Sequence, residues 1–293
     1  PQKCYGKHLG RCARMSYPFS PKQQDTKMNE EKEYRAAPGL NYSNFKHIGK
    51  SPLHYQHQLT APHKDMPAWV MGRLIHLLTF EPFQFEAAYM VWDGRKDKRT
   101  KAYKEALEEA AGREVVTPAE HERALVVAKR ITAHPTMRAL LARPDVQCEK
   151  PLFWDEAPVG PCKGKPDLYV VEGGHHLMMD LKTFNSTDGH QLQMAAFKFG
   201  WHLQMAHYLS GLAHIHGIPT KVEAYLFVAE QEAPHDVRCF KWSNESLELA
   251  FNERQRLLDL LAECTKTNTW PGRGDFGELS PPRWLTIDNK DAS

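Results

Sequence analysis

The stretch "KGKPDLYVVEGGHHLMMDLKTF", residues 163–184, places charged side chains inside apolar segments. Two apolar runs flank a Gly-Gly pair, and this pattern predicts two antiparallel strands joined by a tight turn. Asp167 stands at the start of the first run, and Asp180 and Lys182 stand within the second. An ionised carboxylate in an apolar strand is unfavourable unless a counter-charge or hydrogen bonds offset its desolvation. These three residues therefore need a chemical explanation.

A bound divalent cation is one explanation. Asp167 and Asp180 would lie on neighbouring strands, and adjacent carboxylates repel each other unless they share a cation. Asp180 and Lys182 are two residues apart on one strand, so they point to the same face, where the lysine can orient or deprotonate a water. Oxygen ligands suit Mg²⁺ or Mn²⁺. The alternative is a surface ion pair, because the same acid-x-lysine spacing recurs in the polar segments 30–32 and 288–290.

The remainder of the second half predicts a mixed α/β core with helices packed on a sheet. Alternating or apolar runs indicate further strands, and helical periodicity ending at Gly217 and Pro219 indicates a long helix. The expected strands are residues 146–155, 166–171, 176–184, 221–230 and 236–243, and the expected helices are residues 197–216 and 244–264.

The first half reads differently and predicts a helical portion over residues 37–145, joined to a catalytic core over residues 146–285 in a single domain. Apolar periodicity indicates a buried helix at 67–80, and charge indicates a solvated helix at 96–111. A helix over 117–142 begins with Thr117, Pro118 and Glu120, the signature of a capping box. Residues 1–36 are expected to be a disordered basic arm or a non-native extension, and residues 286–293 a flexible tail.

Composition excludes several classes. The 293 residues are 41% hydrophobic and 25% charged, and no run approaches about 20 apolar residues, so no membrane span is expected. The six cysteines form no C-x-x-C pair, which predicts thiols in a reducing cytoplasm and no iron–sulfur cluster. No H-E-x-x-H occurs, so zinc is not expected. The net charge of +2 does not indicate nucleic acid, although a local basic channel would be invisible in that sum.

Two helical spacings complete the pattern. Gln204 and Tyr208 are four residues apart on one predicted helix, as are Gly72 and His76 on another. The order P-D, D-L-K and Q-x-x-x-Y resembles that of the PD-(D/E)XK nucleases. The G-x-x-x-H helix ahead of it resembles the RecB-like exonuclease branch. The phrases "CEKPLFWDE", "HLQMAHYLSG" and "NTWPG…LSPPRWL" are most similar to the RecE-like (exonuclease VIII) nuclease domains, over about residues 39–285.

The resemblance implies a restriction-endonuclease-like core, a mixed central sheet flanked by helices, and a set of roles. Lys182 would be the catalytic lysine, and Gln204 and Tyr208 would organise the site and contact the DNA backbone. Glu149 matches a possible additional acid. The metal ligands would be His76, Asp167, Asp180 and the backbone carbonyl of Leu181. Without the resemblance, His76 is equally well a hydrogen-bonded core histidine, and the Gln204–Tyr208 pair an ordinary amphipathic face.

The implied activity is a Mg²⁺-dependent DNA exonuclease, with Mn²⁺ able to substitute. By resemblance it would resect linear double-stranded DNA 5′-to-3′, leave 3′ single strands, form a ring-like homo-oligomer and serve a RecT-type annealing protein. A RecB-like or Cas4-like endonuclease or trimming nuclease, and a catalytically silent DNA-binding module, are the alternatives. Basic side chains near the motifs are expected to line the DNA path, namely Arg73, Lys163, Lys165 and Lys198, although the lysines flanking Asp167 could instead only solvate a hairpin edge.

Overall fold

The structure is a computed structural model that describes residues 30–61 and 67–274. Its centre is a five-stranded mixed sheet with the strand order β3-β6-β7-β8-β9. The β7–β8 pair is parallel and the other neighbours are antiparallel. This confirms the expected mixed α/β core. The strands are β3 (Gln147–Cys148), β6 (Leu168–Glu172), β7 (His175–Phe184), β8 (Lys221–Glu230) and β9 (Val237–Lys241).

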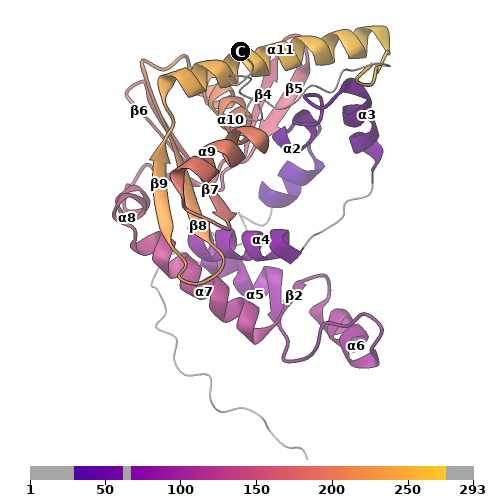
Figure 1. The fold of residues 1–293 in the computed structure, drawn as a ribbon, viewed down its shortest axis with the longest axis vertical. Coiled ribbons are helices and arrows are strands. Elements are labelled where there is room, and N and C mark those ends of the chain that lie inside the picture. The colour runs from indigo at the N-terminus through magenta and orange to yellow at the C-terminus, as the bar shows by residue number, and fades with distance from the viewer. Residues whose placement is uncertain (1–29, 62–66, 275–293) are drawn as a thin grey trace, which may run out of the picture.

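Helices cover both faces of this sheet (Figure 1). Two apolar clusters form the core, one on each face, because β7 and β8 are buried on both sides and send alternate side chains to opposite clusters. One face is covered by α4 (Pro67–Phe80), α7 (Pro118–Ala133) and α8 (Pro135–Leu141). The other is covered by α2 (Tyr42–Phe45), α3 (Pro52–Thr60), α9 (Gly189–Lys198), α10 (Trp201–His216), α11 (Asn244–Thr267) and the hairpin of β4 (Leu152–Glu156) and β5 (Gly160–Gly164).

A smaller unit projects below the sheet in Figure 1. Its two short strands are parallel, and a separate apolar cluster around Tyr103 and Val115 joins them to the charged helix. Its elements are η1 (Pro82–Gln84), α5 (Phe85–Ala88), β1 (Tyr89–Val91), α6 (Lys101–Ala110) and β2 (Glu114–Val116).

Local sequence explains where several elements begin and end. The capping box is present, because Thr117 accepts from the Glu120 amide and the Glu120 carboxylate accepts from the Thr117 amide. Gly173 and Gly174 have φ values of 55° and 77°, which suits the tight turn between β6 and β7. The next pair, β7 and β8, is parallel, and two parallel strands cannot be joined by a tight turn. The chain therefore crosses over from β7 to β8 through α9 and α10.

Three expected elements are each broken in two. The strand over 146–155 was wrong, because β3 ends at Cys148 and β4 lies in a different sheet. Glu149 adopts φ 50° between them and Pro151 lacks an amide donor. The helix over 197–216 starts at residue 201, because Gly200 has φ 75°. The helix over 117–142 breaks at Pro135, which cannot supply a helical amide.

Two further differences concern segments without a clear pattern. Residues 160–164 form β5, paired to β4, although their sequence "GPCKG" indicated no strand. Residues 30–36 are helical, whereas the arm over 1–36 was expected to be disordered; the rest of that arm and the tail over 286–293 lie outside the described residues. Within the described part of the chain, Cys162, Cys239 and Cys264 are reduced thiols.

A buried ion pair ties the β4–β5 hairpin to the last helix. The Arg254 guanidinium donates to both carboxylate oxygens of Glu156, at 2.8 and 2.5 Å, and Trp154 Nε1 donates to the same carboxylate at 2.9 Å. Only 3% of Arg254 and 9% of Glu156 is exposed. Burial alone would raise the pKa of Glu156, but these hydrogen bonds outweigh it and lower the pKa. The pair is therefore ionised in the folded protein at neutral pH.

Replacing Arg254 with Met should lower the free energy of unfolding by about 3–5 kcal/mol at neutral pH, because Glu156 stays buried without its counter-charge. The carboxyl group has a lowered pKa, so its contribution is present above about pH 4.3 and is lost as the pH falls through the folded-state pKa. The gap between wild type and variant should therefore shrink in acid. Urea unfolding monitored by circular dichroism measures it, with Arg256→Met, exposed on the same helix, as control. A gap independent of pH would contradict this account.

Candidate active site

The register of three neighbouring strands aligns three carboxylates. Cys148 pairs with Leu168 across β3 and β6, and Leu168 pairs with Met179 across β6 and β7. One step further along each ladder are Glu149, Asp167 and Asp180. The Glu149 amide donates to the Asp167 carbonyl at 3.0 Å, which continues the ladder by that step. The three acids therefore form a row across the sheet, called the acid row below.

Asp167 is fixed within this row by two different partners. Its Oδ2 accepts a hydrogen bond from the Leu181 amide at 2.6 Å, and its Oδ1 lies 3.4 Å from Nδ1 of His76. Burial alone would raise the pKa of Asp167, but His76, Lys182 and the Leu181 amide outweigh it and lower the pKa. Asp167 is thus an ionised carboxylate although only 8% of the residue is exposed.

Asp180 is buried less favourably. Its Oδ2 pairs with the Lys182 ammonium at 2.6 Å, whereas its Oδ1 is buried and has no hydrogen-bond partner among the described residues. Burial raises the pKa of Asp180 to about 6, with a further contribution from Asp167, against the attraction of Lys182. An unpartnered buried carboxylate oxygen is unfavourable in the protein alone. This oxygen is therefore available to a ligand.

His76 reaches the acid row from α4. Its Nδ1 lies 3.9 Å from Oε1 of Glu149 as well as close to Asp167. Burial disfavours the imidazolium, but the two carboxylates outweigh it and raise the pKa of His76 to about 10. Gly72, one turn earlier, lets the helix approach β7, since a Cβ there would lie 3.2 Å from Oγ1 of Thr183. The G-x-x-x-H spacing thus serves helix approach and ligand placement together.

Two lysines close the β5 side of the site. Lys165 pairs with Glu149 at 2.9 Å and with Glu31 of the helical segment 30–36 at 3.0 Å. Burial works against its charge, but both acids outweigh it and raise the pKa of Lys165. Lys163 is buried and donates to the carbonyls of Tyr34 and Ala37. Both ammonium groups are therefore already neutralised or bound within the protein.

The Q-x-x-x-Y pair forms the wall opposite α4. Gln204 Nε2 donates to Tyr208 Oη at 3.0 Å, which leaves the phenol hydrogen free to donate elsewhere. Burial, with further contributions from the neighbouring Tyr34 phenol and the Asp180 carboxylate, raises the pKa of Tyr208 well above its usual range, so the phenol stays neutral. Gly164 makes room for the ring, since a Cβ there would lie 2.7 Å from Cδ1 of Tyr208.

The structure gathers most of the residues singled out by sequence and leaves others aside. The acid row, His76, Lys182 and the Gln204–Tyr208 pair converge, while the Leu181 amide, not its carbonyl, is seen bound at the site. Arg73 pairs with Glu114 in the small unit, and Lys198 lies 5.8 Å from the Phe199 ring. Sequence reasoning missed Glu31, Tyr34, Tyr42 and Lys46, for which no local pattern gave a signal.

The donor set fits a hard divalent cation. One atom each of His76, Glu149 and Asp167 lie within 4.8 Å of one another, and Asp180 adds its unpartnered oxygen at the neighbouring position of the acid row. Carboxylate oxygens with one imidazole suit Mg²⁺ or Mn²⁺ better than softer metals. In the protein alone, the His76 imidazolium and the Lys165 and Lys182 ammonium groups supply positive charge among these acids.

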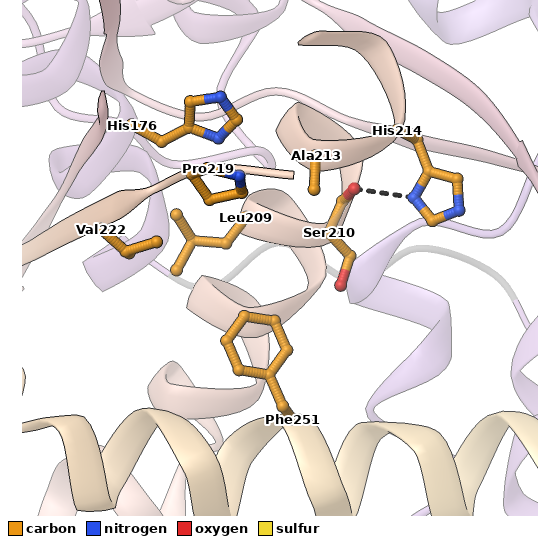
Figure 2. Close-up of a pocket in the computed structure, with 8 residues that line it drawn as sticks. All are labelled: His176, Leu209, Ser210, Ala213, His214, Pro219, Val222 and Phe251. Atoms are coloured by element: carbon orange, nitrogen blue, oxygen red, sulfur yellow. Dashed lines mark hydrogen bonds between the residues drawn. The ribbon is translucent and has the colours of Figure 1, made fainter. Parts of the chain in front are cut away.

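A cavity of about 150 Å³ lies away from the acid row (Figure 2). It is lined mainly by apolar side chains, together with His176, Ser210 and His214, and no carboxylate lines it. His176 precedes Asp180 by four residues on β7, which separates them by about 13 Å. The cavity therefore does not belong to the candidate active site.

The fold and the acid row define a PDDEXK-like domain. The chain belongs to the family described as "PDDEXK-like domain of unknown function (DUF3799)", which it matches over residues 41–279. No curated protein matches the sequence. No helix in the described part of the chain combines the length and the apolar character needed to cross a membrane.

One solved structure with a TM-score above 0.5 shares this fold. A protein from Eubacterium rectale described as a "Putative exonuclease" superposes with a TM-score of 0.57 at 14% identity, covering 88% of this chain and 94% of that one. An alkaline exonuclease from Laribacter hongkongensis is 11% identical, with a TM-score of 0.24 over 59% of this chain and 87% of that one, a score too low to support an argument. The finer resemblance to RecE-like domains stays a prediction.

Saturating Mg²⁺ or Mn²⁺ should raise the melting temperature of the wild type by roughly 5 °C or more at about 100 times the Kd, because the cation binds only the folded acid row. Asp180→Asn should abolish this response. Without cation the variant should be at least as stable as wild type, since it removes a buried negative charge that has one unpartnered oxygen and is repelled by Asp167. Differential scanning fluorimetry measures both, with the exposed Asp155→Asn as control. An equal cation response in Asp180→Asn would contradict the assignment.

Proposed function

We propose that this protein is a divalent-metal-dependent DNA exonuclease. The observation that carries the proposal is the acid row, with Lys182 paired to its last member and His76 beside its centre. Membership of a PDDEXK-like family and the fold shared with the Eubacterium rectale protein support it. The same features serve an endonuclease equally well, so the choice of an exonuclease rests on the resemblance to the RecB-like branch.

Glu149, Asp167, Asp180 and His76 would hold the cation. When bound, it supplies Lewis-acid polarisation of a phosphoryl oxygen and offsets the negative charge that develops during phosphodiester hydrolysis. The His76 imidazolium must lose its proton to act as a ligand, so binding of a divalent cation would release that proton and replace its single positive charge with two.

The other side chains would position the substrate and the attacking water. Lys182 shares a strand face with Asp180, and its side chain is 20% exposed, so its ammonium can reach a water or a phosphate oxygen. Tyr208 keeps a neutral phenol whose hydrogen is free to bind a phosphate oxygen, while Gln204 fixes its orientation. Prearranged donors of this kind stabilise charge without reorganising during the reaction.

Polarity, product and partners depend on the resemblance alone. We expect 5′-to-3′ resection that leaves 3′ single strands, a ring-like homo-oligomer and hand-off to a RecT-type annealing protein. Mg²⁺ is the expected cation, with Mn²⁺ as substitute, because the donors are mainly carboxylate oxygens.

Purified protein with Mg²⁺ should release nucleotides from linear duplex DNA and leave covalently closed circles intact. Duplexes labelled at either the 5′ or the 3′ end give the polarity from the order in which label is released. Asp180→Asn should release nothing, because the acid row loses a ligand. Cutting of closed circles at a comparable rate would favour the endonuclease alternative, and DNA binding without any cation-dependent cleavage would favour the silent module.

Lys182→Ala should lower the turnover number for linear duplex DNA by about 100-fold or more, a typical loss for a group that assists proton transfer. Its thermal response to Mg²⁺ should persist, because all the carboxylates remain. Lys221→Ala, an exposed lysine at the far end of the sheet, provides the control and should match wild type. Undiminished turnover in Lys182→Ala would reduce this residue to an ion-pair partner of Asp180.

A further inference from the structure

The segment that connects α2 to α3 carries positive charge without any acid. Residues 34–64 contain no Asp or Glu, and the turn between the two helices presents Lys46, His47, Lys50 and His54. Lys46, Lys50 and His54 are exposed, and His47 is half-buried. Among the described residues, neither Lys46 nor Lys50 has a carboxylate partner. We call Lys46, His47, Lys50 and His54 the basic turn.

The basic turn adjoins the active site. It follows Tyr42, whose Oη donates to the carbonyl of Gly200 at the start of α10, the helix that carries Gln204 and Tyr208. Desolvation of the ammonium group, together with repulsion from Lys50 and from Lys182, lowers the pKa of Lys46. Burial, together with repulsion from Lys50 and Lys46, lowers the pKa of His47 to about 4, so this imidazole is neutral at pH 7. Like charges held together are unfavourable, and the repulsion is relieved when an anion lies between them.

The turn is held rigidly against the helix that carries the Q-x-x-x-Y pair. Tyr42 Oη donates to the carbonyl oxygens of Phe199 and Gly200, just before α10. Phe45 is fully buried and stacks on the His207 ring at 5.8 Å, and Ile48 is 1% exposed. These anchors alternate with the outward-pointing lysines. The two ammonium groups therefore extend from a fixed backbone.

The two flanks of the site differ in charge. On the β5 flank, Lys163 and Lys165 are bound by carbonyl and carboxylate oxygens of the protein, as described above. On the α2–α3 flank, Lys46 and Lys50 have no such partner within residues 30–61 and 67–274, and the Arg273 side chain adds a further cation by donating to the Lys50 carbonyl at 3.0 Å. A polyanion gains more from the flank where basic groups are not already paired.

We propose that the basic turn binds the phosphate backbone of the nucleic-acid strand whose scissile bond lies at the acid row, with Lys46 and Lys50 as the principal phosphate contacts. This rests on the proposed nuclease function. It replaces the expectation that Lys163 and Lys165 provide these contacts. Ammonium groups contacting phosphates carry no base information, so the surface fits any sequence, as an exonuclease requires.

The test compares Lys46→Ala/Lys50→Ala with wild type in binding a short fluorescein-labelled duplex, followed by anisotropy in Ca²⁺ over a range of salt concentrations. Each lost phosphate contact should flatten the log–log salt slope by about 0.9 on duplex DNA, so the double variant should lose about 1.8. Lys46→Arg/Lys50→Arg should restore most of the slope. Lys101→Ala/Lys104→Ala, on exposed α6 of the small unit, should behave like wild type.

Hydrolysis of bis(p-nitrophenyl) phosphate, which has no backbone to bind, separates this inference from the proposed function. If the inference holds, Lys46→Ala/Lys50→Ala cleaves this small diester like wild type but degrades DNA more slowly. If this variant has the salt slope of the wild type and cleaves DNA normally, the proposed phosphate contacts of the basic turn are contradicted, whereas the proposed nuclease function is unaffected. If the wild type cleaves neither substrate but the double variant still shows the flattened salt slope, the basic turn is supported as a DNA-binding surface and the proposed nuclease function is overturned.

Discussion

The burial of adjacent carboxylates on neighbouring strands is the constraint on which the rest of this structure depends. Two like charges about 4 Å apart repel by roughly 4 kcal/mol at an effective dielectric constant near 20. The protein offsets this with the His76 imidazolium, the Lys182 ammonium and the Leu181 amide. The compensation is incomplete, because Asp180 retains an unpartnered oxygen. That deficit is what the proposed cation would remove, and it distinguishes the acid row from a fully paired ion-pair network.

Precise placement of these groups requires a stiff support. The acid row takes its spacing from the ladders of β3, β6 and β7, which the hydrogen bond from the Glu149 amide to the Asp167 carbonyl extends by one step. The opposite wall depends on α10, which is packed against the β4–β5 hairpin, where Gly164 accommodates the Tyr208 ring. The buried Arg254–Glu156 pair ties that hairpin to α11. Residues remote from the chemistry thus hold both walls in register, as preorganised sites require.

The charge distribution around the site is directional. The β5 flank has its lysines bound by the protein's own oxygens, including Glu31 of the helical segment 30–36, whereas the lysines of the α2–α3 flank have no acidic partner in the part of the chain that the structure describes. A nearly neutral chain can therefore still present a local basic surface. The net charge of +2 conveys none of this, because it sums paired and unpaired groups alike.

Sequence alone determined the features that depend on near neighbours along the chain. The Gly-Gly hairpin, the Thr117 capping box and the Asp180–Lys182 spacing follow from local periodicity and turn chemistry, and the structure shows each of them. Gly72 and His76 were likewise marked by their helical spacing, since residues four apart share a helix face.

Only the tertiary structure decided which charges meet across the chain. Lys163 and Lys165 lie close to Asp167 in sequence, yet they are bound by residues 31–37, while Lys46 approaches Lys182 from a segment more than a hundred residues earlier. The break at Glu149 and strand β5 also carried no local signal, because each arises from pairing with distant partners. Coulomb interactions and strand pairing depend on distance in space, which a linear pattern does not encode.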